Sequence, residues 1–408
     1  MDFDSSLGFP GEGPLRPPPF LLLYAVAQGA LCCTVVSGRT LAVFSAMAMF
    51  KPGEGMMPRN SADLTRSLRR GALPLADGRP VLAATNFNRD ALFSVFLEWC
   101  SNQQIDFLGL LENALVNAEE INTWLASYGR QLYRAGRPYG HYSETINAVV
   151  SQKAILRRYL QPAWDVAYSW MRNEPPSHHT AMPWQVLLSL LPTAILWGWI
   201  REAGLLALAF GGLLRPGECL NAVRRDLLLP GDTRFSNTFV LLALEEAKTR
   251  FSAARHQCAK LDSPDLAKLV VLAFGHLLPN ERLWPHSNQT FRNRFRQLQS
   301  AVGLPQRDFH GCRPLDLGSL RPGGATWLLQ VTENSELVRR RGRWTTTKVL
   351  EVYLQETACV KYLNCLDETA KDTVFSLAML FPACLAKAGN LVDAQIPPTV
   401  WFKIFRWS

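Results

Sequence analysis

The segment from Leu320 to Glu356 constrains this chain more than any other. It opens with LRPGGATWLLQ, continues through an acidic-then-basic stretch that ends in RRRGRW, and closes with TTTKVLEVYLQE. Arg321 stands before a Pro-Gly-Gly run, which predicts a helix start with room for close backbone approach. Trp344 follows 23 residues later (344 − 321) and Tyr353 another 9 (353 − 344). The threonines before Tyr353 predict the cap of a helix that carries this tyrosine on its apolar face.

The composition predicts a folded protein with a basic part. The 408 residues have room for two domains plus tails, and 48% apolar against 19% charged residues exclude an intrinsically disordered chain. The net charge of +9 is uneven, because residues 201–365 hold 23 Lys/Arg against 15 Asp/Glu, a net +8 (23 − 15). Residues 87–176 hold 8 against 9. A positive field on one part is typical of a polyanion-binding surface, although basic proteins without that role share this composition.

The cysteines and histidines do not form a metal-binding pattern. Nine cysteines are scattered without a CxxC pair, and no Cys/His set has the spacing of a zinc site. Their odd number in a long chain favours a reducing compartment over secretion. His178 and His179 are adjacent, which suits a linker better than a metal site. We therefore expect neither a metal nor another cofactor.

Residues 1–85 are interpreted as an N-terminal extension of unknown role. The stretch 20–50 is strongly apolar and begins FLLLYAVAQGALCCTVV, so a signal or membrane segment is one interpretation. Polar residues at 37–39 interrupt the run, and the preceding GFPGEGPLRPPP is a poor basic leader, which favours a packed or disordered extension. We expect an intracellular protein, nuclear if the source is eukaryotic, with the membrane or signal segment left open.

Helical periodicity from residue 86 to residue 172 predicts a compact bundle domain. FNRDALFSVFLEWCSNQ predicts a first helix, and its expected buried face consists of Leu92, Val95, Phe96 and Cys100. Three further helices are expected in AEEINTWLASYGRQLYRAG, which stops near Gly136 and Pro138, in HYSETINAVVSQKAILRRYL with Ser143 as N-cap, and over Trp164–Trp170. The Pro- and His-rich NEPPSHHTAMP then predicts an interdomain linker at 173–182.

The rest of the chain predicts a second domain at 183–365 and a C-terminal tail at 366–408. Helices resume at Trp184 and at Ile200. Thr238–Leu244 and Ala254–Leu261 read as strands on either side of a polar EEAKTRFSA tip, which predicts a β-hairpin. The expected fold class is therefore mainly α with a small β-sheet (α+β).

Five residues of the second domain supply the chemistry needed to attack a phosphodiester with a tyrosine. They are Arg215 in GGLLRPGE, Lys248 at the hairpin tip, Arg321, Trp344 and Tyr353. The transition state concentrates negative charge on phosphate oxygens, and without a metal fixed cations have to stabilise it. Arginine donates from a planar fork, an indole N–H can also donate, and a lysine can protonate the leaving oxygen. Each residue alone has a commoner explanation, such as a surface ion pair or a core tyrosine, so only their combination indicates catalysis.

This set resembles the tyrosine recombinase (phage integrase) family. The family motif runs Arg, a hairpin Lys, His-x-x-Arg, then His or Trp, and last a nucleophilic Tyr. The matching positions are Arg215 with the acidic Glu218 after it, Lys248, Arg321, Trp344 and Tyr353. The likeness spans residues 86–365, and the C-terminal motifs are similar in style to recombinases encoded by eukaryotic mobile elements.

The resemblance carries expectations about fold, partner and reaction. It implies a helical core-binding (SAM-like) DNA-binding domain followed by a recombinase catalytic domain. It implies double-stranded DNA as the partner, no small-molecule substrate, and DNA cleavage and rejoining through a 3′-phosphotyrosyl intermediate, as in site-specific recombination or integration of a mobile element. It further implies a homo-oligomer assembled on DNA through the C-terminal tail. Two alternatives stay open: a catalytically impaired, domesticated DNA-binding protein, and type IB topoisomerase-like nicking and rejoining.

Gly318 departs from the family pattern, because it stands where the His-x-x-Arg motif has His or Lys. Glycine can neither accept the tyrosine proton nor hydrogen-bond a phosphate through a side chain. Ser319, His310 or a water molecule are the candidate replacements. Loss of a proton-transfer partner costs about 10²–10⁴-fold in rate, so this position decides between an active and an impaired enzyme.

Overall fold

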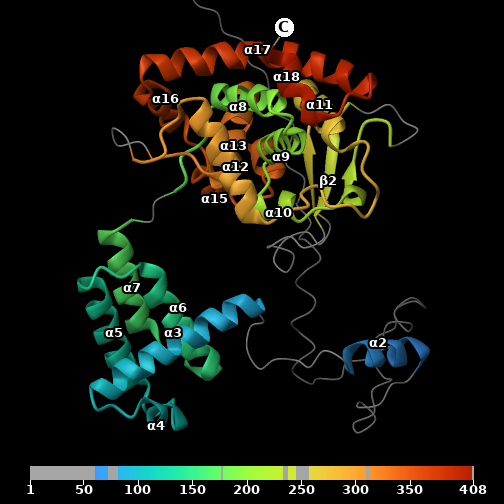
Figure 1. Ribbon diagram of the computed structural model, residues 1–408. Helices are drawn as coiled ribbons and strands as arrows, with labels where there is room; N and C mark the ends of the chain where they lie inside the picture. The colour runs from blue at the N-terminus through green and yellow to red at the C-terminus, as the bar shows by residue number, and fades with distance from the viewer. Residues whose placement is uncertain are drawn as a thin grey trace, which may run out of the picture. The chain divides into compact units, whose positions relative to one another are not determined.

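The computed structural model describes residues 60–71, 81–175, 178–232, 238–244, 257–308 and 313–406. Within these residues the chain is mainly helical with one three-stranded antiparallel sheet (Figure 1), which confirms the predicted fold class. The chain divides into two compact units, Met1–Trp170 and Met171–Ser408. The apolar stretch at 20–50 lies outside the described residues.

The first unit contains a helical bundle with an aromatic core. α2 (Ser61–Gly71) precedes the bundle in the chain. The bundle consists of α3 (Ala83–Asn102), α4 (Phe107–Glu112), α5 (Ala118–Arg134), α6 (Tyr139–Gln152), η1 (Ala154–Arg158) and α7 (Gln161–Asn173), whose last turn passes into the second unit. Phe96 contacts Phe107 edge-on at 4.7 Å between ring centroids, and Trp170 stacks on Tyr142 at 6.2 Å. α2 was not expected, since residues 1–80 show no clear helical period.

One local prediction for this bundle is wrong in part and another is wrong. The buried face of α3 holds Phe96 and Cys100, as predicted, but its third member is Phe93, whereas Val95 is exposed and Leu92 is half-buried. The i, i+3, i+4 rule fits either face, and tertiary packing selects the more aromatic one. α6 begins at Tyr139 after an extended Pro138, so Ser143 lies inside the helix and does not cap it. The predicted stop after α5 is confirmed, with Gly136 at φ +67°.

The second unit contains the helices and strands that bear the predicted chemistry. Its helices are α8 (Trp184–Leu196), α9 (Ile200–Gly211), α10 (Pro216–Leu220), α11 (Pro264–Phe274), α12 (Asn288–Ala301), α13 (Leu320–Thr332), α14 (Ser335–Arg341), α15 (Thr347–Glu351), α16 (Glu356–Cys365), α17 (Glu368–Asp393) and α18 (Trp401–Arg406). The short 3₁₀ turns are η2 (Arg224–Asp226), η3 (Leu317–Ser319) and η4 (Pro398–Val400). The strands are β1 (Leu227–Leu228), β2 (Val240–Leu244) and β3 (Gln257–Leu261).

The sheet confirms the predicted hairpin. β2 pairs with β3 in antiparallel register from Val240↔Leu261 to Leu244↔Gln257, and β1 pairs with the other edge of β2. The inward residues of β2 alternate with outward ones, as expected for a strand packed on one side. Lys248, predicted at the hairpin tip, lies outside the described residues.

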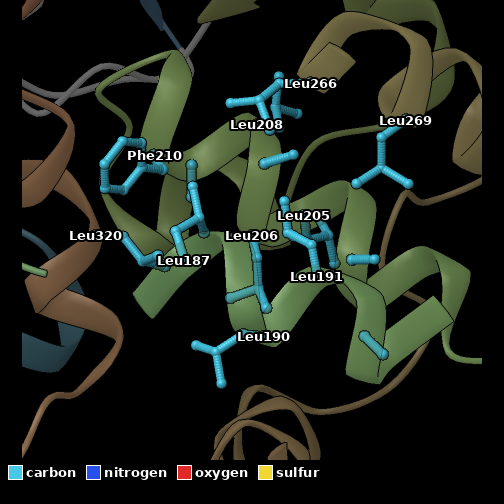
Figure 2. Close-up of a cluster of buried hydrophobic side chains, with 14 of the residues drawn as sticks. Leu187, Leu190, Leu191, Leu205, Leu206, Leu208, Phe210, Leu266, Leu269 and Leu320 are labelled. Carbon is cyan, nitrogen blue, oxygen red and sulfur yellow. The ribbon is translucent and has the colours of Figure 1, made fainter. Parts of the chain in front are cut away.

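The core of the second unit is built from α8, α9, α11 and α17. Figure 2 shows leucines of α8 and α9 packed together, with Leu266 and Leu269 of α11 beside them. α9 is buried almost along its whole length, which explains why its sequence lacks a polar face.

The predicted C-terminal tail is instead part of this core. α17 packs along α8 (Figure 1), and its buried side includes Val374, Phe381 and Leu385. Among the described residues α17 is the one helix long and apolar enough to cross a membrane, with a mean hydropathy of 1.5, and 33% of its apolar window is buried. Trp401 of α18 is fully buried in the same core.

Two glycines bring the start of α13 against the backbone of Met182 and against the end of α9, as the Pro-Gly-Gly run predicts. A Cβ at Gly323 would collide with the carbonyl oxygen of Met182, and a Cβ at Gly324 with the carbonyl oxygen of Phe210. Only glycine permits backbones to approach so closely. This contact places Arg321, the second residue of α13, near the turn that carries Arg215.

Candidate active site

Arg215 lies at a sharp turn, as its sequence context predicts. α9 ends at Gly211, Leu213 adopts a left-handed φ of +50°, and Pro216 starts α10 directly after Arg215. The backbone N–H of Arg215 donates to Glu218 Oε2 at 2.9 Å, and its Nη1 donates to Glu218 Oε1 at 2.7 Å. Because its own α10 supplies this carboxylate, the arginine is held at the helix start with its side chain 31% exposed.

Arg321 is buried at the centre of the site. It is 3% exposed, and its Nη2 donates to the carbonyl oxygen of Gly342 at 2.6 Å. The guanidinium carbon lies 4.9 Å from the ring centroid of Trp344 and 5.5 Å from that of Tyr353, which are cation–π distances. Trp344 and Tyr353, two of the predicted residues, therefore both lie at cation–π distance from the Arg321 guanidinium.

Arg343 belongs to the same site, although the sequence did not single it out. Its side chain is 8% exposed, and Nη2 donates to Glu218 Oε2 at 2.7 Å. Its φ of +59° lies in the left-handed region, which is costly for a non-glycine residue and is maintained only where the surroundings enforce it. The RRRGRW run reads as a basic helix end, so the one buried arginine in it has no distinguishing signal in the sequence.

Glu218 is the shared counterion of this arginine cluster. Burial works to raise the pKa of its carboxyl, but the charge of Arg343, the backbone N–H of Arg215 and the other two guanidiniums outweigh it, so the pKa lies below its ordinary value. For Arg321, burial together with the charges of Arg215 and Arg343 lowers the pKa to about 10. Three guanidiniums face one carboxylate, which leaves an excess of two positive charges (3 − 1) in a largely buried site.

Several N–H groups of the site have no acceptor within the described parts of the chain. They are Nε and Nη1 of Arg321, Nε and Nη1 of Arg343, and Nε1 of Trp344. Buried donors are nearly always paired in folded proteins, since an unpaired one costs about 1–3 kcal/mol. Five such donors beside an excess positive charge are suited to an anion with several oxygens.

Tyr353 borders the arginines but does not lie on a helix, so that prediction is wrong. α15 ends at Glu351, and Tyr353 occupies the turn before α16, with its ring 4.7 Å from that of Trp344. The hydroxyl of Thr326 donates to the Tyr353 carbonyl oxygen and accepts from the N–H of Gln355. These bonds replace the helical partners of both backbone groups and stop the helix. The predicted threonine cap is confirmed, because Thr346 accepts from the N–H of Val349.

Gly318 lies in η3, one turn before Arg321. Ser319, one candidate replacement for its missing side chain, is fully buried, and its N–H and hydroxyl are both engaged with Asp316. His310, the other candidate, lies outside the described residues. Within the described ranges no group of three His, Cys, Asp or Glu side chains is arranged to hold a metal ion.

No protein-family model matches this chain, and no curated protein sequence matches it significantly. Among solved structures it is similar to XerA recombinase, with 12% identity and a TM-score of 0.35 over 67% of this chain and 97% of that one. It is also similar to XerH site-specific recombinase bound to difH substrate in a pre-cleavage complex, with 13% identity and a TM-score of 0.37 over 71% of this chain and 90% of that one. Both identities and both TM-scores are low, so the function proposed below rests on the site itself.

Proposed function

We propose that this protein cleaves and rejoins double-stranded DNA with Tyr353 as the nucleophile. The observation that carries the proposal is the set of five donor nitrogens on Arg321, Arg343 and Trp344, beside the tyrosine ring, for which no described residue supplies an acceptor. A phosphodiester offers two non-bridging oxygens with several acceptor positions, which matches this donor set better than a single carboxylate does.

In the proposed step the hydroxyl oxygen of Tyr353 attacks the scissile phosphorus. A bond forms between that oxygen and phosphorus while the hydroxyl proton passes to a general base. The bond from phosphorus to the 5′ oxygen breaks, and the strand is left as a 3′-phosphotyrosyl ester with a free 5′ hydroxyl. Arg215, Arg321 and Arg343 stabilise the charge on the phosphate oxygens, and the Trp344 indole donates to one of them. Lys248 gives its proton to the departing 5′ oxygen.

Rejoining is the reverse of this step, and no external energy source is needed. A 5′ hydroxyl attacks the phosphotyrosyl phosphorus, and the tyrosine leaves with its proton restored. When the attacking hydroxyl belongs to another strand, the outcome is recombination, as in integration of a mobile element. When it belongs to the same strand, the outcome is relaxation of supercoils.

Recombination needs more than one protomer on the DNA, and α17 offers a surface for such an assembly. Phe375, Met379 and Leu380 are about half to four-fifths exposed on the side of α17 that faces away from its own core. The basic character of residues 201–365 supplies the attraction to phosphate groups.

A second candidate is a DNA-binding protein of the same fold without catalysis. Gly318 favours it, because a glycine in that position contributes no proton acceptor. Such a protein uses the arginine cluster for phosphate binding and does not depend on the Tyr353 hydroxyl.

Covalent adducts separate the two candidates. Protein and DNA are purified from expressing cells under denaturing conditions without a crosslinker, and the attached DNA is sequenced for wild type and Tyr353→Phe. The proposal predicts adducts at defined sites in wild type that are absent in the variant. Equal recovery of covalently attached DNA from both proteins would contradict the enzymatic proposal. If both proteins then bind DNA equally well, the second candidate is supported.

A further inference from the structure

The imidazole of His179 occupies the space in which a side chain at Gly318 would begin. A Cβ built on Gly318 would lie 2.7 Å from both Cγ and Nδ1 of His179 and 2.8 Å from its Cδ2. Real Cβ atoms do not come so close to a ring, so a side chain at position 318 would force the imidazole to shift from this position. The glycine and the histidine are therefore a matched pair across 139 positions of sequence (318 − 179).

Asp316 orients this ring. Nδ1 of His179 lies 2.9 Å from Asp316 Oδ2, and the same aspartate caps η3 through the N–H of Ser319. A carboxylate on one imidazole nitrogen fixes the proton there and leaves the other nitrogen, Nε2, as an acceptor. The side chain is 62% exposed, so a ligand can reach the imidazole.

The backbone around His179 is hydrogen-bonded both to the turn that carries Tyr353 and to the start of α13. On one side, the Gln355 side chain donates to the carbonyl oxygen of His179 at 3.0 Å and accepts from the N–H of Ala181 at 3.0 Å. Gln355 follows Tyr353 by two residues (355 − 353). On the other side, the N–H of Met182 donates to the carbonyl oxygen of Ser319 at 3.1 Å. The segment is thus held between the tyrosine turn and the start of α13.

The imidazole of His179, which lies against Gly318, is on the same side of the chain as Arg321. η3 runs directly into α13, and residues three apart on a helix are neighbours on one face. An imidazole seated at Gly318 therefore lies beside the helical face that carries the buried guanidinium.

We infer that His179 is a catalytic residue of the proposed reaction, in which it accepts the proton of the Tyr353 hydroxyl during attack on phosphorus. This rests on the proposed function. Nε2 takes the proton as the bond between oxygen and phosphorus forms, and the imidazolium beside Asp316 returns it when the tyrosine leaves during rejoining. Gly318 then makes room for a histidine from a distant segment, and its lack of a side chain does not signal an impaired enzyme.

The test measures the rate of covalent adduct formation by the full-length protein on a duplex oligonucleotide carrying a site recovered from wild-type adducts. The variants are His179→Ala, His179→Gln, the single changes His179→Gly and Gly318→His, the exchange that combines these two, and the neighbouring control His178→Ala. Melting temperature and DNA binding are recorded for each, so that loss of fold is separated from loss of rate. Added imidazole is tested on His179→Gly, because a small base can replace a missing proton acceptor but not a structural contact.

The expected result is a loss of about 10²–10⁴-fold in rate for His179→Ala and His179→Gln, with DNA binding retained and His178→Ala at the wild-type rate. Imidazole accelerates His179→Gly, and the exchange recovers rate that Gly318→His alone does not, since that single change collides with His179. Wild-type rates in His179→Ala or His179→Gln overturn the inference while leaving Tyr353 as nucleophile. Loss of rate without any rescue by imidazole or by the exchange also overturns it. Absence of Tyr353-dependent adducts in the wild type overturns the proposed function and the inference together.

Discussion

The guanidinium of Arg321 lies 4.9 Å from the ring of Trp344, and both side chains keep N–H groups that no described residue accepts. The contact stabilises the buried charge through the face of the indole, while no described residue accepts from the indole N–H. Stability and phosphate binding therefore depend on different atoms of Trp344, so a substitution can separate them.

Trp344→Phe is expected to leave stability unchanged or raise it slightly, and to slow DNA cleavage. The phenyl ring retains the contact with Arg321, and removal of an unpaired buried donor relieves a penalty of about 1 kcal/mol. The matched control is Trp284→Phe. The wild-type Trp284 indole donates to the Ser287 carbonyl oxygen at 2.9 Å, so loss of this bond should lower the free energy of unfolding by about 1 kcal/mol. Urea unfolding of both variants checks this. A larger loss for Trp344→Phe than for Trp284→Phe is incompatible with an unpaired N–H.

Glu218→Gln is expected to lower the free energy of unfolding by about 3 kcal/mol at neutral pH. The substitution keeps the shape of the side chain but leaves Arg215, Arg321 and Arg343 without their shared counterion in a buried site. Chemical denaturation of wild type and variant measures the difference.

The difference in stability between wild type and Glu218→Gln should depend on pH. The pKa of Glu218 is lowered in the folded state, so its contribution is present above the ordinary carboxyl pKa of about 4.3 and is lost as pH falls through the lowered value. The stability difference between wild type and Glu218→Gln should accordingly shrink below about pH 4. A difference that stays constant from neutral to acidic pH would show that the carboxylate charge is not what stabilises the cluster.

Gly324→Ala is expected to destabilise the second unit by about 3 kcal/mol, because its Cβ would meet the carbonyl oxygen of Phe210. Gly389→Ala in α17 is the control, since a Cβ there has nothing within 4 Å. Replacing a helical glycine by alanine where the Cβ has free space should raise the free energy of unfolding by up to about 1 kcal/mol. Thermal unfolding of the two variants should move in opposite directions, and equal shifts would refute the close contact between α9 and α13.

The local structure around Gly324 could be predicted from the sequence, whereas that around Tyr353 could not. The turn before Arg215, the helix start at Arg321 and the hairpin strands follow from local preferences of Gly, Pro and alternating apolar residues, and the structure contains them. The helix expected to carry Tyr353 ends early, because Thr326 from another helix captures the backbone groups of residues 353 and 355. Local pattern contains no information about such a tertiary competitor.

Arg343 and His179 were missed for a related reason. Arg343 sits in a run of arginines in which the others form surface or partly exposed pairs, with Glu336 for Arg339 and Arg340 and with Asp262 for Arg341. Its burial is decided by Glu218, 125 residues away. His179 was assigned to a linker. Its place beside Gly318 depends on two hydrogen bonds that only the folded chain makes, from the Gln355 side chain to the carbonyl oxygen of His179 and from the N–H of Met182 to the carbonyl oxygen of Ser319. The assignment of roles to Arg215, Lys248, Arg321, Trp344 and Tyr353 stays a prediction.

The central claim is that Tyr353 becomes covalently bonded to DNA, and mass spectrometry of the adduct tests it most directly. Adducts from wild-type protein are digested with nuclease and trypsin, and the peptide from residues 349 to 361, VLEVYLQETACVK, is sought with a nucleotide attached. Tyr353 is the one tyrosine in that peptide, so the modified residue is unambiguous. A nucleoside monophosphate is expected on Tyr353, attached through its phosphate. Wild-type adducts attached to any other residue, or DNA that co-purifies without a covalent bond, would contradict it.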